Sequence, residues 1–301
     1  MNMKNKIADF NKAVALDTKN EKALHNRGLA KYALKDFAGA IADQTQAIAI
    51  NPAYSNAYND RGMVYYRQNN YTAALNDYNA AIKNDPAYFL AYKNRATVQV
   101  ALKNYAAADN DYTKCIELKP EDADGYLGRG SMKSIQNNYA EAISFYDKAI
   151  QYEPNNAVTF LNRGNAKYAL KDTKGALPDY IKVSQLQPNN VNVYFNLGTI
   201  YMTQNKSNEA IEAFKKYNSG LPNEWSGYKN TADVYYTQLK QYDQAEIYYN
   251  KAYQINKSQK DIIERLGYSL LNQKKIPQAI AMFNNQIALL PNDYWGYYNL
   301  G

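Results

Sequence analysis

Alanine recurs along this chain at a nearly constant interval, and no other feature constrains its fold as strongly. The alanines are Ala40, Ala74, Ala108, Ala142, Ala176, Ala210, Ala245 and Ala279, which lie 34 residues apart except for one step of 35. Prolines and glycines follow the same interval. A period of this length is typical of repeat proteins, in which each unit packs only against its neighbours. We therefore expect one body built by stacking copies of a single unit.

Each unit is predicted to contain two helices. In residues 55–88, apolar and small residues recur at helical spacing over 58–66 and again over 74–82. Two asparagines at 69–70 separate the stripes as a turn signal. Pro86 ends the second stripe, because proline cannot continue a helix. The unit therefore consists of helix A, a short turn, helix B and a turn that carries proline.

This pattern resembles the tetratricopeptide repeat (TPR). The motif residues are the alanines above, glycine at position 8 of the unit, proline near its end, and an aromatic residue at position 4, which is Tyr58, Tyr92, Tyr126, Phe160, Tyr194 and Tyr228 in successive repeats. The resemblance covers essentially the whole chain. It implies an all-α fold, a right-handed superhelical solenoid of antiparallel helix pairs.

We expect a single TPR solenoid over residues 1–301. Its repeats are predicted at 21–54, 55–88, 89–122, 123–156, 157–190, 191–224, 225–259 and 260–293. Residues 1–20 are predicted to form a lone helix B, and 294–301 the start of a further repeat. The seventh repeat carries an extra residue, which we place in its internal turn, and Pro178 is expected to delay or kink its helix B.

The composition argues against several classes of protein. Cys115 is the only cysteine and His25 the only histidine, so neither a disulfide framework nor a histidine-based metal site is available. No phosphate-binding glycine loop or nucleophile elbow occurs, so we predict no catalytic residue, no metal, no cofactor and no enzymatic activity. No stretch approaches the roughly 20 apolar residues of a membrane span. The opening MNMKNK lacks a secretory apolar region, which favours a cytoplasmic protein or one whose leader has been removed.

Arginine stands at position 7 of the first five repeats, where the TPR family commonly has leucine. These residues are Arg27, Arg61, Arg95, Arg129 and Arg163. An aspartate follows 16 residues later in four of the five repeats: Asp43, Asp77, Asp111 and Asp179. Arg129 is followed instead by Phe145, and repeats six to eight have neither residue. The shared presence favours Arg–Asp pairs buried between helices A and B of one repeat. The alternative is an arginine ladder that binds phosphate.

Position 6 of helix A is predominantly asparagine, and in TPR proteins this face lines the concave groove. Asparagine offers both a donor and an acceptor, so a row of them can hold the backbone of an extended peptide. The row resembles the asparagine ladder in the TPR arm of O-linked N-acetylglucosamine transferases. The alternative is that these amides bond to neighbouring helices. The predicted peptide-binding residues are Asn26, Asn94, Asn162, Asn196 and Asn230, with apolar contacts from Leu161, Phe195, Tyr168 and Tyr236.

Three functions fit these observations. The first is a non-catalytic scaffold that binds a protein or an extended peptide in its groove. The second is a substrate-recruiting or regulatory arm of a larger, possibly enzymatic, protein, which a chain beginning and ending inside a repeat would suit. The third is binding of single-stranded nucleic acid, which the acidic residues of the last two repeats disfavour. The chaperone-binding carboxylate clamp of TPR proteins is incomplete in every window of three repeats.

Overall fold

The computed structural model describes residues 3–300 as a succession of helices, with no β-strand among these residues. Helices A are α2 (Glu21–Ala33), α4 (Ser55–Arg67), α6 (Phe89–Ala101), α8 (Ala123–Ile135), α10 (Ala157–Ala169), α12 (Val191–Thr203), α14 (Trp225–Val234), α16 (Lys260–Asn272) and α18 (Tyr294–Tyr298). Helices B are α1 (Met3–Leu16), α3 (Phe37–Ile50), α5 (Tyr71–Asn84), α7 (Tyr105–Leu118), α9 (Tyr139–Tyr152), α11 (Thr173–Leu186), α13 (Ser207–Gly220), α15 (Tyr242–Ile255) and α17 (Ile276–Leu289). The predicted all-α fold is therefore confirmed.

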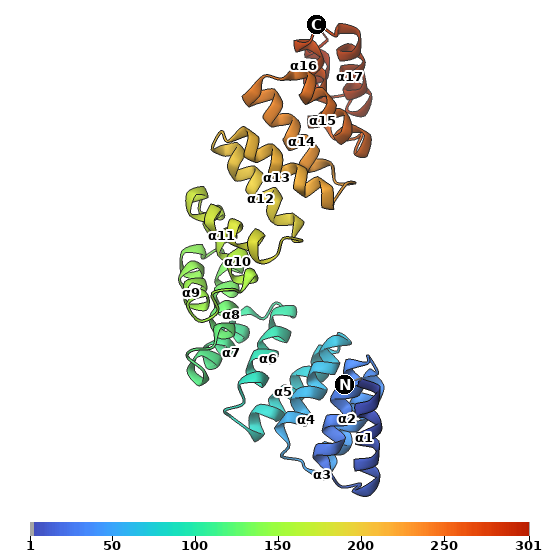
Figure 1. Cartoon of the computed structure of the whole chain (residues 1–301), viewed down its shortest axis with the longest axis vertical. Coiled ribbons are helices and arrows are strands. Elements are labelled where there is room, and N and C mark those ends of the chain that lie inside the picture. The colour runs from blue at the N-terminus through green and yellow to red at the C-terminus, as the bar shows by residue number, and fades with distance from the viewer. Residues whose placement is uncertain (1–2, 301) are drawn as a thin grey trace. The chain divides into compact units, whose positions relative to one another are not determined.

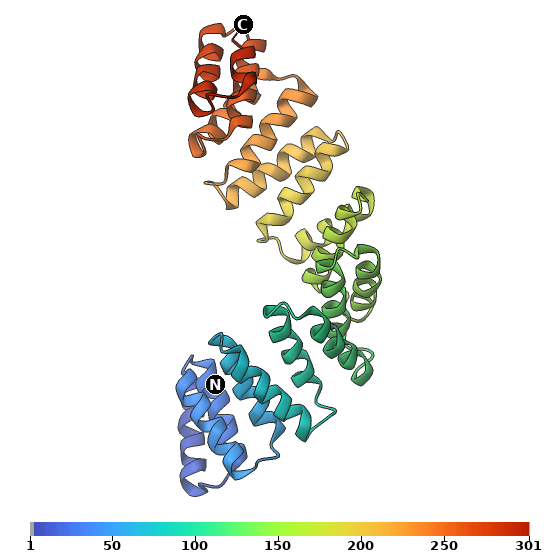
Figure 2. The ribbon, with the colours of Figure 1, turned by 180° about the vertical axis from the view of Figure 1, so that it is seen from behind.

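The helices form two compact units, residues 1–154 and residues 155–301. Within each unit, every helix packs against the next one in the chain (Figure 1). Helices A also contact one another, α2 with α4 and α4 with α6 in the first unit and α12 with α14 in the second. The same succession of pairs is seen from behind in Figure 2. None of the helices in the described part of the chain is both long and apolar enough to cross a bilayer.

Helices A and B cross closely where the sequence supplies a small residue. The recurring alanines from Ala40 to Ala279 are fully buried. A Cβ atom added at Gly62 would lie 2.8 Å from the ring of Tyr78, and one at Gly198 would lie 2.6 Å from the ring of Phe214. Real Cβ atoms do not come so close, so a larger residue at these positions would displace the aromatic ring. The small residues thus set the spacing of the helix pair.

The turn between the two helices has one conformation in every complete repeat. A single residue adopts a left-handed backbone, at Lys35, Asn69, Lys103, Asn137, Lys171, Asn205, Lys240 and Lys274. A left-handed residue after a helix allows its last carbonyl groups to be bonded by the following amides. The turn therefore reverses the chain in two or three residues without leaving the helix end unsatisfied.

The structure contradicts one local expectation and one half of another. The extra residue of the seventh repeat does not lengthen the turn; it lies in a π-helical segment, η1 (Tyr235–Leu239), that ends helix A. A π-bulge absorbs one residue without breaking the helix. Pro178 does not delay its helix, because α11 begins at Thr173 and keeps Pro178 inside it. The alternative, a kink at Pro178, stays a prediction.

Candidate functional site

The arginines at position 7 face an aspartate of their own repeat. Arg61 donates from Nε and Nη2 to the two carboxylate oxygens of Asp77 at 2.8 and 2.7 Å. The same two-pronged contact joins Arg27 to Asp43, Arg95 to Asp111 and Arg163 to Asp179. All four aspartates are buried. These hydrogen bonds raise the pKa of Arg61, and the predicted pairs between helices A and B are confirmed.

The guanidinium groups of Arg27, Arg61 and Arg95 also reach helix B of the preceding repeat. Nη1 of Arg61 donates to Oγ1 of Thr45 at 3.0 Å, and Nη1 of Arg95 donates to Oδ1 of Asn79 at 2.7 Å. The guanidinium of Arg61 also lies 5.8 Å from the ring centre of Tyr58, the aromatic residue at position 4. We call this arrangement of arginine, aspartate and preceding helix B the arginine clasp. It ties three helices of two repeats together.

Arg129, which lacks an aspartate in its own repeat, finds one in the preceding repeat. Its Nε donates to Oδ1 of Asp109 at 2.9 Å, and its guanidinium lies 4.6 Å from the ring centre of Phe145. This pairing was not predicted from the sequence. Asp109 lies one helical turn before Thr113, the counterpart of the residues Thr45 and Asn79 that the other arginines contact. Helical spacing could therefore have revealed it. With their carboxylate partners in place, these guanidinium groups do not form the alternative phosphate-binding ladder.

In the first unit, the A-helix face is largely bonded to itself. Asn94 donates from Nδ2 to Oδ1 of Asn59 at 2.9 Å, so this predicted site residue has a partner on the preceding helix A. Buried His25 lies 3.5 Å from Asp60, whose pKa is raised by burial. Lys93 pairs with Asp124 on the next helix A. The other predicted residue of this unit, Asn26, is exposed, and its side chain makes no hydrogen bond within the described residues.

In the second unit, the position 6 amides are available. Asn162 on α10, Asn196 on α12 and Asn230 on α14 are half-buried, and within the described residues their side chains make no hydrogen bond. Neutral amides with unused donors and acceptors can bond to a peptide unit that lies across them. We call these three residues the amide row. The charges around it are balanced, since both Lys229 and Arg265 pair with Asp233 and Asp261.

The four residues predicted to supply apolar contacts are buried to different extents. Phe195 packs against Phe214 and Tyr217, with ring centres 5.8 and 5.1 Å apart, and is partly buried. Tyr236 is also partly buried, and its hydroxyl accepts a hydrogen bond from Asn272. Leu161 is half-buried, whereas Tyr168 is exposed. Leu161 and Tyr168 therefore offer the more accessible apolar surface beside the amide row.

No three carboxylate, cysteine or histidine side chains of the described residues gather as a metal site requires. Cys115 is fully buried, and burial raises the pKa of its thiol to about 12. A thiol that stays protonated and enclosed is a poor nucleophile. What the described residues offer to a ligand is therefore hydrogen-bond donors and acceptors.

Sequence models of the tetratricopeptide repeat match more than half of the chain. They cover residues 21–54, 55–88, 93–157, 164–205 and 232–259. The chain belongs to the tetratricopeptide repeat family. TPR units typically mediate contacts between proteins, and the chain is in this sense a protein-interaction scaffold. No curated protein matches the chain.

Solved TPR structures share the fold at low sequence identity. A tetratricopeptide repeat protein from Parabacteroides merdae is 21% identical, with a TM-score of 0.55 over 76% of this chain and 90% of the other. MamA from Desulfovibrio magneticus is 17% identical, with a TM-score of 0.53 over 57% of this chain and 97% of the other. YrrB, described as a TPR protein with an unusual peptide-binding site, is 20% identical, with a TM-score of 0.50 over 61% and 95%. At these identities the likeness concerns the TPR fold alone.

Proposed function

We propose that this TPR protein binds an extended peptide segment of a partner protein along helices α10, α12 and α14, without catalysis. The observation that carries the proposal is the amide row, whose three asparagines occupy equivalent positions on consecutive helices A and make no side-chain hydrogen bond within the described residues. Amides bonded to neighbouring helices, as Asn94 is to Asn59, would support only the fold. A row of unused amides suits the repeated N–H and C=O groups of a peptide backbone.

The residues beside the row suit the side chains of such a peptide. Leu161 and Tyr168 offer apolar surface next to Asn162, and apolar or aromatic anchors supply most of the affinity in protein interfaces. Lys229 and Arg265 balance Asp233 and Asp261, so this cluster carries no net charge. We therefore expect recognition through backbone amides and apolar side chains, with weak dependence on salt.

The test is a triple variant, Asn162→Ala, Asn196→Ala and Asn230→Ala. A peptide is selected from a random dodecamer display library on the wild-type protein, and its Kd is measured by calorimetry. Each neutral hydrogen bond contributes about 0.5–1.5 kcal/mol, so the triple variant should raise Kd at least about tenfold. The melting temperature should change little, because these amides support no other residue.

The matched control replaces Asn155, Asn189 and Asn223 by alanine. These asparagines follow the prolines of the same region, are exposed, and lie in turns rather than on helices A. The control should bind like the wild type. The proposal would be overturned if the triple variant bound the selected peptide with unchanged Kd. It would also be overturned if every peptide from the library bound the wild type and the triple variant equally well.

A further inference from the structure

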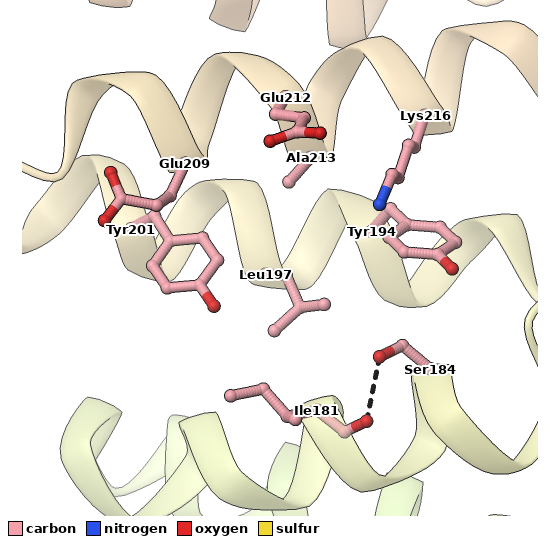
Figure 3. Close-up of a pocket in the computed structure, with 9 residues that line it drawn as sticks. All are labelled: Ile181, Ser184, Tyr194, Leu197, Tyr201, Glu209, Glu212, Ala213 and Lys216. Atoms are coloured by element: carbon pink, nitrogen blue, oxygen red, sulfur yellow. Dashed lines mark hydrogen bonds between the residues drawn. The ribbon is translucent and has the colours of Figure 1, made fainter.

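A small hollow lies in the second unit between α11, α12 and α13. It measures about 270 Å³, and Figure 3 shows the nine residues that line it. Ile181, Leu197 and Ala213 form an apolar floor, with Tyr194 and Tyr201 on either side. Drug-sized ligands generally occupy about 300–1,000 Å³. The hollow is therefore of the size that one long side chain fills.

The hollow takes the place of an arginine clasp. Leu197 stands at position 7, where the first five repeats have arginine, and Ala213 stands where four of them have the aspartate. Ile181 is the counterpart of Thr45, the residue of the preceding helix B that Arg61 contacts. Leucine and alanine occupy less space than arginine and aspartate, so space remains between the helices.

A second cation is missing from the same place. In the fifth repeat, Lys167 donates to Asp179 at 2.9 Å beside Arg163. The sixth repeat has Tyr201 at the position of Lys167. In the sixth repeat, Leu197 and Tyr201 thus replace the two cations of the fifth repeat, Arg163 and Lys167.

The rim of the hollow carries carboxylates in their place. Glu209 and Glu212 are exposed, and neither forms an ion pair or a hydrogen bond with another described residue. The fifth repeat has Gly175 and Pro178 at these two positions. The single cation of the hollow, Lys216, lies 5.5 Å from the ring centre of Tyr194. The hollow therefore combines an apolar interior with an excess of negative charge at its edge.

We propose that this hollow binds an arginine or lysine side chain of a partner protein, which supplies in trans the cation that the first five repeats supply themselves. The aliphatic stem would contact Leu197 and Ile181, as long basic side chains do when their charged end remains in a polar setting. The charged end would reach Glu209 and Glu212 at the rim. The hollow lies between the helices B α11 and α13 and the helix A α12, and no residue of the amide row lines it.

A neighbouring hollow extends the surface. It measures about 390 Å³, is lined in part by Ile211, Tyr235 and Leu239, and shares Glu212 with the first. The π-helical segment of the seventh repeat supplies both Tyr235 and Leu239. A partner segment that places its basic side chain in the first hollow can therefore place an apolar residue in the second.

The experiment titrates the whole protein with N-acetyl-arginine amide and follows its backbone amides by NMR. We expect saturable shifts confined to residues of α11, α12 and α13. The neutral isostere N-acetyl-citrulline amide should give shifts at least about tenfold weaker in apparent affinity, because only the charged form makes charge-assisted bonds. Equal binding of the two compounds would overturn the proposal, as would arginine-dependent shifts outside these helices.

Two variants sharpen the result. Glu209→Gln with Glu212→Gln should raise the Kd of the arginine probe at least about tenfold. The control, Glu117→Gln with Glu121→Gln, changes the net charge equally at exposed positions of the first unit and should leave Kd unchanged. If the control weakens binding as much, the attraction is non-specific and the proposal fails.

A third variant rebuilds the clasp. Leu197→Arg with Ala213→Asp should fill the hollow from within, retain the helical circular dichroism spectrum, and abolish binding of the probe. A rebuilt clasp that still binds it would contradict the assignment. So would a wild-type dimer that Glu209→Gln with Glu212→Gln dissociates, because a second copy of the chain would then be the occupant.

Discussion

At the scale of single residues, the arginine clasp replaces part of an apolar core by a polar one. Leucine at position 7 would bury hydrocarbon, whereas Arg61 places a charge beside buried Asp77. The attraction within a buried pair is largely offset by the loss of hydration, so the pair adds little net stability. An aspartate left without its arginine is costly, because its charge stays buried without compensation.

The sixth repeat suggests how to test this balance at Arg61. Arg61→Leu alone leaves Asp77 uncompensated and should lower the free energy of unfolding by about 3 kcal/mol. Adding Asp77→Ala reproduces the pair Leu197 and Ala213 and should recover most of that loss. Urea unfolding followed by circular dichroism measures both variants. A double variant as unstable as the single one would mean that the pair itself is strongly stabilising.

Buried phenols and one buried thiol make the fold sensitive to alkali. Burial raises the pKa of Tyr78, Tyr180 and Tyr249, and that of Cys115 to about 12. Between the ordinary pKa of these groups and the raised one, the unfolded chain releases protons that the folded chain keeps. The stability that these buried neutral groups contribute is therefore fully present below about pH 8. The free energy of unfolding should fall steadily above about pH 9.

The measurement is the urea midpoint at several pH values from 7 to 11. Cys115→Ala, which places at this position the alanine found at Ala47 and Ala81, should lessen the decline without abolishing it. A midpoint independent of pH over this range would contradict the expected linkage.

At the scale of the helix, the chain tolerates local departures from ideal structure. The π-helical segment absorbs an inserted residue, and α11 continues through Pro178. A proline inside a helix removes one backbone hydrogen bond and crowds the preceding turn, at a cost of about 3 kcal/mol. Tertiary packing outweighs this local penalty, because α11 contacts both α10 and α12.

Pro178→Ala should therefore stabilise the protein, by about 1–3 kcal/mol, since it restores the missing hydrogen bond. Pro277→Ala is the matched control, because Pro277 lies in the first turn of α17, where proline has no bond to break. Thermal and urea unfolding should separate the two substitutions. Equal effects would mean that α11 has adapted to its proline.

At the scale of the whole molecule, contacts between neighbouring helices dominate the fold. Leu266 and Phe283 of the last repeats share one core cluster with Ala232 and Tyr249 of the seventh repeat. No comparable cluster joins distant repeats in the described part of the chain. Stability should then be roughly a sum of repeat and interface contributions.

Deleting residues 260–301 should accordingly cause a graded loss. The remaining chain should keep repeats one to six helical, with a lower melting temperature because the seventh repeat loses its packing partners. Circular dichroism of the shortened protein measures both quantities. Complete loss of helicity would reveal coupling beyond nearest neighbours.

Residue spacing along the chain was enough to predict the repeat, its two helices and the four Arg–Asp pairs within single repeats. These features depend on spacings of 34 residues or fewer, which helical periodicity converts directly into contacts. Residue spacing also revealed the row of asparagines as a pattern, and this pattern remains a predicted site.

Which of these side chains already have a partner becomes visible only once the repeats pack together in three dimensions. Asn94 and Asn162 occupy the same repeat position, yet Asn94 bonds to Asn59 while Asn162 is unbonded within the described residues. Arg129 similarly found Asp109 across the repeat boundary. Such choices depend on how the side chains of adjacent repeats approach one another in space, and equivalent sequence positions have different neighbours once the repeats have diverged.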